Sequence, residues 1–193
     1  MNLRRTTLVG AAIACAAVLL PAVALASSGS AGSNTAGSSA GSKTATASRC
    51  TRGDLTAWLG EPGDGTAGST YYQLELSNIS HRTCTLYGFP GVSALSGGKQ
   101  LGTAAKRSPG DPERVVTLAP RATTHVVLQI TDTGVYSPSA CKPATALSLR
   151  VYPPGAYNSI VVPFSFGACA KHGPVFLHVT PVLAGTGIPG YSS

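Results

Sequence analysis

The side chains that could take part in catalysis or metal binding are few and widely separated. The chain has four histidines and seven acidic residues among 193 positions. The histidines are His81, His125, His172 and His178, and the acids are Asp54, Glu61, Asp64, Glu75, Asp111, Glu113 and Asp132. The sequence contains no nucleophile elbow, zinc-protease helix or phosphate-binding loop. It therefore predicts no catalytic, cofactor-binding or metal-binding residue.

Glu75 is the acid with the most informative neighbours. It lies with Gln73 on the polar face of the alternating run 72–76, so we expect both side chains to be solvated. A glycan hydrolase would need a second carboxylate, such as Asp132, or a histidine brought next to Glu75 by folding. The sequence alone does not show such a convergence.

Three tyrosines in or near turns could bind a ligand instead. Stacking of Tyr136, Tyr152 and Tyr157 on a sugar would make a possible ligand face. Rings in a β-rich domain more often serve as packing, as we expect for Tyr72, Phe166 and Phe176. A cell-wall glycan or an extracellular protein would be the partner of such a face.

Four of the five cysteines lie in the part of the chain that should fold. Cys50, Cys84, Cys141 and Cys169 form an even set, which indicates two disulfides in an exported protein, with three possible pairings. We favour the sequential pairs Cys50–Cys84 and Cys141–Cys169. A zinc site is the alternative, but no C-x-x-C occurs and the histidines do not cluster with the cysteines.

The amino terminus has the pattern of a secretory signal peptide. Arginines precede an apolar run over residues 8–25, and small residues at 24–26 form a cleavage site, so we expect residues 1–26 to be removed. A transmembrane anchor is the alternative, disfavoured because the run is short and contains Pro21. Lipidation at Cys15 is disfavoured because the apolar run continues beyond it.

The remaining chain divides into a tether, one domain and a tail. Residues 27–48 consist almost entirely of Ser, Gly, Ala and Thr, which cannot bury enough surface to fold, so we expect a disordered tether. Residues 49–183 are long enough for one domain with a core, and residues 184–193 should form a flexible tail. The mature chain is expected to contain no transmembrane segment.

Short alternating runs separated by turn residues indicate an all-β domain. The main runs are 70–76, 92–95, 100–104, 115–118, 124–130, 146–152, 160–164 and 175–179. This pattern predicts an antiparallel, immunoglobulin-like β-sandwich of about eight or nine strands with two disulfides. Leu147 should share the inward face with its i+2 neighbours, Trp58 should fill the core, and Pro163 indicates an edge strand.

The stretch 78–91 connects two of these runs. Asn78 and Ser80 are turn formers, Cys84 and Leu86 begin a return strand, and Gly88 and the Pro-Gly pair that follows break it. The motif Asn78-x-Ser80-x-x-x-Cys84-x-Leu86-x-Gly88-x-Pro90-Gly91 resembles that of domain of unknown function 4232.

The resemblance covers about residues 50–181, including the other three cysteines and Thr117-Leu118-Ala119-Pro120. It implies a secreted β-sandwich of the kind found in exported, often lipid-anchored, actinobacterial proteins, and it implies no known activity. One departure is Arg121, where the family usually has glycine. If the turn there requires a positive φ angle, Arg121 must adopt it at some energetic cost.

The charge of the chain bears on its partners. The formal charge of +7 becomes +5 when Arg4 and Arg5 leave with residues 1–26. The remaining basic residues are scattered and do not alternate with aromatic residues, which argues against nucleic-acid binding. We therefore predict a secreted or cell-envelope-exposed, non-enzymatic binding or structural module. The alternatives are a protease inhibitor presenting loop 108–114 or 135–141, and a cell-wall-polymer hydrolase.

Overall fold

The computed structural model describes residues 47–62, 65 and 67–188, which lie in one compact unit. Its elements, in chain order, are η1 (Arg52–Asp54), β1 (Leu55–Pro62), β2 (Ser69–Asn78), β3 (Cys84–Leu86), β4 (Gly91–Ser96), β5 (Lys99–Leu101), β6 (Lys106–Arg107), β7 (Val116–Leu118), β8 (Thr123–Thr131), η2 (Thr133–Val135), α1 (Pro138–Cys141), β9 (Pro143–Tyr152), β10 (Ile160–Cys169), β11 (Leu177–Val179) and β12 (Leu183–Ala184). The predicted signal peptide, Cys15 and most of the predicted tether lie outside the described residues.

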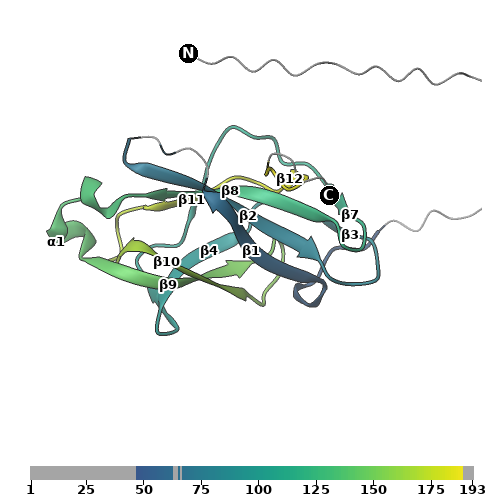
Figure 1. Cartoon of the computed structure of the whole chain (residues 1–193), viewed down its shortest axis with the longest axis horizontal. Helices are drawn as coiled ribbons and strands as arrows, with labels where there is room; N and C mark the ends of the chain where they lie inside the picture. Colours follow the sequence, from purple (N-terminus) through teal and green to yellow (C-terminus); the bar gives the residue numbers. More distant parts are fainter. Residues whose placement is uncertain (1–46, 63–64, 66, 189–193) are drawn as a thin grey trace, which may run out of the picture. The chain divides into compact units, whose positions relative to one another are not determined.

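The strands form three sheets. The largest has the order β1-β2-β8-β11-β6, with β12 paired to β8; the second has the order β10-β9-β4-β5; and β3 pairs with β7. All of these pairs are antiparallel except β11 with β6. In Figure 1, β1, β2 and β8 lie in one layer and β9 and β10 lie in the other. The all-β prediction is confirmed, with the two layers arranged as a sandwich, whereas the immunoglobulin-like topology stays a prediction.

The core contains the inward-facing residues of both layers. On β2 and β8 the alternation predicted from sequence is correct, because Leu74, Leu76, Val126 and Leu128 are fully buried. Leu147 is an exception, since its side chain is 57% exposed. Leu147 lies where the pairing of β10 with β9 shifts by one residue, between Pro163 and Phe166, and the buried positions of β9 change there from Leu149 to Ala146.

The twelve strands of the described residues exceed the eight or nine predicted, because several contain only two or three residues. β10, which carries Pro163, lies at the edge of its sheet as predicted. Its proline therefore lies where a missing N–H interrupts no ladder on the outer side.

The corner between β2 and β3 is built around Asn78. Its side-chain amide donates to the carbonyls of Arg82, Leu118 and Ala119 at 2.9–3.1 Å, and its Oδ1 accepts from the Ser80 amide and hydroxyl at 3.0 and 2.7 Å. This network joins β2 to the β3–β7 pair. Asn78 is therefore a structural residue of the corner.

The turn before β8 has the positive φ angle that was considered for Arg121 from the sequence. Arg121 has a φ of 69°, in the left-handed region that favours glycine. Its amide donates to the Asn78 carbonyl at 2.9 Å, and the Asn78 amide donates to the Ala122 carbonyl at the same distance. These two bonds hold Arg121 in the strained conformation.

The structure contains both disulfides in the predicted pairing, Cys50–Cys84 and Cys141–Cys169. All four cysteines are buried. The first joins the segment before η1 to β3, and the second joins the end of α1 to the end of β10. Each cross-link thus fixes a segment that has few backbone bonds of its own.

We expect the double variant Cys141→Ala/Cys169→Ala to lose about 3–4 kcal/mol of unfolding free energy, since the disulfide closes a loop of 28 residues in the unfolded chain. Urea unfolding of the oxidised wild type and the variant, followed by circular dichroism, measures the difference. A loss below about 1 kcal/mol would show that the reduced chain is already constrained in this region.

Residues from 184 onward pack against the largest sheet, contrary to the expectation of a flexible tail from residue 184. β12 pairs with β8 at His125 and Thr124, and the chain remains packed through Thr186, which is buried, to Ile188. We call residues 183–188 the strap. Residues 189–193 of the predicted tail lie outside the described part of the chain.

Two side chains on this face differ from expectation. Glu75, predicted to be solvated, is fully buried. Trp58, predicted to fill the core, lies beside Glu75 in the register of β1 with β2, and it is 37% exposed with its indole N–H donating to the Ser77 hydroxyl at 3.0 Å. Alternation assigned Glu75 to the outer face correctly, but it could not reveal that the strap packs against neighbouring side chains of that face.

Candidate functional site

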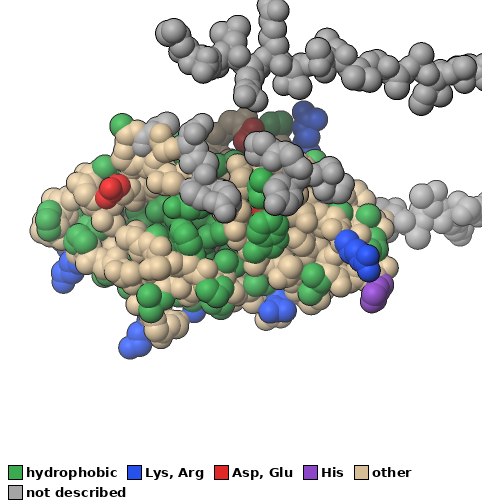
Figure 2. Space-filling view, in the orientation of Figure 1, with side chains coloured by type: hydrophobic (Ala, Val, Ile, Leu, Met, Phe, Trp, Pro, Cys, Tyr) green, Lys and Arg blue, Asp and Glu red, His purple; other side chains and the backbone are tan. Residues whose placement is uncertain are grey.

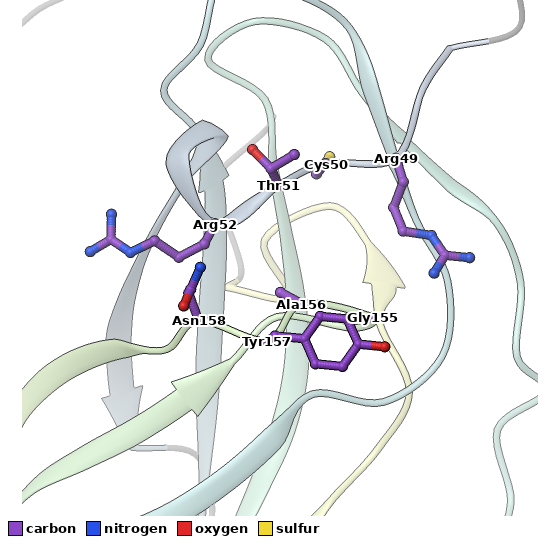
Figure 3. A pocket seen from close by; sticks show the side chains of 8 residues that line it. All are labelled: Arg49, Cys50, Thr51, Arg52, Gly155, Ala156, Tyr157 and Asn158. Atoms are coloured by element: carbon purple, nitrogen blue, oxygen red, sulfur yellow. The ribbon is translucent and has the colours of Figure 1, made fainter.

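A pocket of about 260 Å³ lies between the segment that enters the domain and the loop that joins β9 to β10. It is lined by Arg49, Cys50, Thr51, Arg52, Gly155, Ala156, Tyr157 and Asn158. Figure 3 shows the entering segment on one side of the pocket and the Tyr157 ring on the other, with the two arginine side chains extending in opposite directions. Two arginines, an asparagine and a tyrosine thus line one opening.

The entering segment is fixed to β3. Arg49 forms a bridge with Thr85, the Cys50 amide donates to the Thr85 carbonyl at 2.9 Å, and the Cys50–Cys84 disulfide lies in the same place. The Thr85 amide in turn donates to the Ser48 carbonyl at 3.0 Å, so Ser48 of the predicted tether already belongs to the fold. This wall of the pocket is therefore held by covalent and backbone bonds.

Asp54 fixes the next turn of the same wall. Its carboxylate accepts from the Thr51 amide and hydroxyl at 2.7 and 2.6 Å, from Arg82 Nε at 3.1 Å, and forms an ion pair with the same guanidinium. The Thr51 hydroxyl, together with the Thr51 amide and Arg82, lowers the pKa of Asp54 from 3.8 to about 2. Asp54 is therefore ionised at neutral pH, and its charge is balanced by Arg82.

The arginines of the pocket have no such partner among the described residues. Arg52 Nε donates to the Ser159 carbonyl at 3.4 Å, and the Arg49 guanidinium lies over Gly155. A Cβ at Gly155 would lie 2.5 Å from Arg49 Nη1, so glycine allows this close approach. Neither guanidinium contacts a carboxylate of the described chain, and both are exposed. The pocket is thus positively charged.

Tyr157 gives the opposite wall a freely accessible ring. The preceding turn is closed by a hydrogen bond from the Ala156 amide to the Pro153 carbonyl at 2.9 Å, and Tyr157 is 96% exposed. Guanidinium groups recognise carboxylates and phosphates, and an exposed ring can stack on a sugar. The pocket therefore combines groups suited to an anionic saccharide.

Comparison with known proteins supplies a family and no function. The model of the family described as domain of unknown function (DUF4232) matches residues 50–182. The chain belongs to the DUF4232 family. No curated protein and no solved structure matched it. The activity of this DUF4232 domain therefore has to be inferred from its own residues.

The three tyrosines predicted to form a ligand face are not brought together. Tyr157 lines the pocket, and Tyr152 is half-buried at the nearby end of β9, next to Gly91 in the register with β4. Tyr136 precedes α1 at the opposite end of β9, where its hydroxyl donates to the Val175 carbonyl at 2.8 Å. β9 has ten residues, and such a strand spans about 30 Å. Tyr136 cannot share a ligand with Tyr157.

Sequence reasoning missed the arginines of the pocket. Arg49 and Arg52 were counted among scattered charges, and Figure 2 shows Lys and Arg side chains that are indeed separated on the face in view. Their position beside a disulfide cysteine was the available signal, because a cross-link fixes neighbouring side chains. The chain separation between these arginines and Tyr157 concealed their contact with the same pocket.

A second hollow lies at the open edge between β1 and β10. This groove of about 470 Å³ includes Trp58, Tyr72 and Phe164, and the ring of Phe164 packs against those of Tyr72 and Phe166 at centroid distances of 5.0 and 5.2 Å. Figure 2 shows hydrophobic side chains gathered between the two layers on this face. The lining contains no charged residue to orient a ligand, so we regard the arginine pocket as the better candidate.

The structure does not assemble the predicted hydrolase residues. Glu75 is buried on β2, whereas Asp132 caps η2, accepting from the Gly134 amide at 2.8 Å. The register of β2 with β8 separates them by about 20 Å along the sheet. Among the described residues, no group of three or more His, Cys, Asp or Glu side chains could hold a metal ion.

Two further features bear on location and on the inhibitor alternative. None of the helices in the described part of the chain has the length and apolar character needed to cross a bilayer. The two disulfides indicate an oxidising compartment. Of the two loops considered for an inhibitor, residues 135–141 fold partly into the short helix α1, whereas residues 109–114 are exposed.

Proposed function

We propose that this DUF4232 domain is an exported, non-enzymatic binding module, and that its ligand is an anionic glycan of the cell envelope. The observation that carries the proposal is the pocket in which Arg49 and Arg52, without carboxylate partners, flank the exposed ring of Tyr157. The signal-peptide pattern and the tether composition of residues 1–48 support export to the envelope.

The chemistry of the pocket favours binding over catalysis. Asp54, the acid nearest in sequence to the pocket arginines, is ionised and occupied by Thr51 and Arg82, so it is unsuited to proton transfer at neutral pH. The volume of about 260 Å³ lies just below the range of roughly 300–1,000 Å³ typical of small-molecule sites. A single charged sugar or the end of a polymer fits this size.

The proposal is tested by the affinity of the mature chain for wall polymers. Isothermal titration with uronic-acid and phosphate-bearing glycans, against neutral glycans of the same length, should show binding of the anionic polymers that weakens with salt. The variant Arg49→Ala/Arg52→Ala should lower the affinity about 10–100-fold, since a hydrogen bond to a charged group contributes roughly 1.5–3 kcal/mol.

The matched control removes two positive charges away from the pocket. Lys99→Ala/Lys171→Ala changes exposed residues on the β4–β5 hairpin and after β10, and it should alter the affinity less than about threefold. Tyr157→Ala tests the ring separately. Equal losses in the pocket and control variants would indicate attraction by net charge alone and would refute a specific site.

The protease-inhibitor alternative now depends on residues 109–114, the part of loop 108–114 that is exposed. Incubation of the mature chain with subtilisin-like and trypsin-like proteases at stoichiometric excess tests it. If the proteases cleave the loop and keep their activity, the inhibitor alternative is refuted. The binding proposal is unaffected by that result.

A further inference from the structure

Glu75 is the most unusual ionisable group among the described residues. Its side chain is fully buried on the outer face of the largest sheet, and neither carboxylate oxygen has a hydrogen-bond partner in the structure. In register, its neighbours across the sheet are Trp58 on β1 and His125 on β8. A buried carboxylate without donors is unfavourable when it is charged.

The strap contacts the residues that surround this position. Leu183 and Ala184 pair with β8, and the Thr124 hydroxyl donates to the Leu183 carbonyl. His125 Nδ1 lies 2.7 Å from the Gly185 carbonyl, which can only accept, so this nitrogen carries the proton. The strap therefore holds β8 at two side chains.

The strap continues from β8 across β2 to β1. A Cβ at Gly187 would lie 2.7 Å from His125 Nε2 and 2.9 Å from Gln73 Oε1, and Ile188 lies against Gly60 of β1. The lack of a side chain at Gly187 therefore allows the backbone to lie directly on the polar side chains of the sheet. All three strands around Glu75 are thus in contact with the strap.

Among the described residues, no side chain forms an ion pair with Glu75. Of its neighbours on the sheet, Trp58 on β1 does not titrate, Gln73 on β2 is neutral, and the Nδ1–H of His125 on β8 is directed to the strap. The strap itself, Leu183–Ile188, contains no ionisable side chain. Burial accordingly raises the pKa of Glu75 from 4.5 to about 8.

We propose that the strap is a proton-dependent cover, which lies on the sheet while Glu75 is neutral and lifts from it when Glu75 ionises. In the closed state the carboxyl proton is retained beneath the strap. In the open state the proton has passed to solvent, water hydrates the carboxylate, and the row of Trp58, Glu75 and His125 becomes accessible. The proposal is independent of the arginine pocket, which is built from other residues.

Opening of the strap requires less disruption than unfolding of the domain. The strap contains the two-residue strand β12, and its two glycines, Gly185 and Gly187, have positive φ angles. Segments held by few backbone bonds are the ones that open locally while the core persists. The two disulfides and the β2–β8 ladder do not depend on it.

The sole tryptophan of the chain reports on this event because Trp58 lies directly opposite Glu75. The mature protein should show a change in tryptophan emission between pH 5.5 and 9.5, with a midpoint near 8. Far-ultraviolet circular dichroism should stay constant over the same range. Hydrogen exchange, corrected for the intrinsic effect of pH, should show protection of residues 183–188 lost with the same midpoint.

The variant Glu75→Gln should keep the emission and the protection of the closed state at every pH. A chain ending at Ala184 provides the matched open state and should show the high-pH emission throughout. The same transition in Glu75→Gln would overturn the proposal, as would a wild-type strap that stays protected at pH 9.5. A change in circular dichroism at the same midpoint would also overturn it, because the domain would then be unfolding as a whole.

Discussion

The variant Asn78→Ala is expected to lose roughly 4–5 kcal/mol of unfolding free energy, although it removes only a small polar side chain. The side chain is 1% exposed and supplies donors to three carbonyls, those of Arg82, Leu118 and Ala119. Alanine leaves these acceptors without the donor, and each buried unsatisfied group costs about 1–3 kcal/mol. The corner would also lose the two bonds that Oδ1 accepts from Ser80.

Two matched variants separate the donor from the acceptor half of this side chain. Asn78→Asp retains an acceptor for Ser80 but places carboxylate oxygen against the three carbonyls, so it should be at least as unstable as alanine at pH 7. Ser80→Ala should lose about 1 kcal/mol, since it removes a hydroxyl and leaves the amide pair.

Urea unfolding with both disulfides oxidised measures all three variants of the corner. A loss below about 2 kcal/mol for Asn78→Ala would mean that water replaces the donor at the corner. Such a result would mean that the Asn-x-Ser part of the motif stabilises only the local turn. Backbone hydrogen bonds would then link β2 to the β3–β7 pair.

The features that sequence predicted are those determined by neighbours along the chain. Alternation in β2 and β8 identified Leu74 and Leu128 as core residues, because the side-chain period of a strand is fixed by its backbone. The Asn78 turn is similarly local. Arg121 could be assigned a possible positive φ because the family pattern has glycine at that place, and the structure has this conformation.

The features that sequence could not predict depend on segments brought together from far apart. The alternation of polar and apolar residues placed Glu75 on the outer face. Nothing in residues 183–188 indicates that they pack beside it, since they form only a two-residue strand and contain no charged side chain. Leu147 is exposed at the place where the register of β9 with β10 shifts and the alternation of β9 is interrupted. Trp58 was assigned to the core from its size, whereas its parity in β1 places it outward.

The candidate pocket shows the same limit. Its two walls come from residues 49–52 and 155–158, more than half of the described chain apart, and the disulfide to Cys84 positions only the first of them. The position of Tyr157 near a turn made it a candidate ligand-binding residue, but no local sequence pattern links it to Arg49. Composition identifies the residue types that could bind a ligand, and the topology of β3 and β9 decides which of them meet.

The burial of Glu75 should make the stability of the whole domain depend on pH with an unusual sign. A carboxyl whose pKa rises from 4.5 in the unfolded chain to about 8 in the folded one binds more protons in the folded state between these values. The unfolding free energy should therefore fall as the pH rises from about 4.5 to about 8, and level off above. With about 1.4 kcal/mol for each unit, the total loss is roughly 3–5 kcal/mol.

The variant Glu75→Gln removes this dependence. It should match the wild type within about 1 kcal/mol at pH 5 and exceed it by roughly 3–5 kcal/mol at pH 9, because a neutral amide replaces the ionising group in the same space. Its new N–H donors also meet an environment that contains an unpaired acceptor, Gln73 Oε1. Urea unfolding at each pH, followed by circular dichroism, gives the two curves.

Another group with a shifted pKa acts in a different window. Burial, with a smaller effect of Lys106, lowers the pKa of His178 below its ordinary value of 6.5, so its contribution is lost as the pH falls through the range below 6.5. Between pH 6.5 and 9, the pH dependence of the unfolding free energy therefore reports on Glu75 and not on His178.

The control variant is Glu113→Gln, which neutralises an exposed carboxylate and should leave the wild-type slope unchanged. A wild-type curve that is flat over this interval would mean that Glu75 is hydrated in the folded protein, and the strap would then lie over a water-filled site.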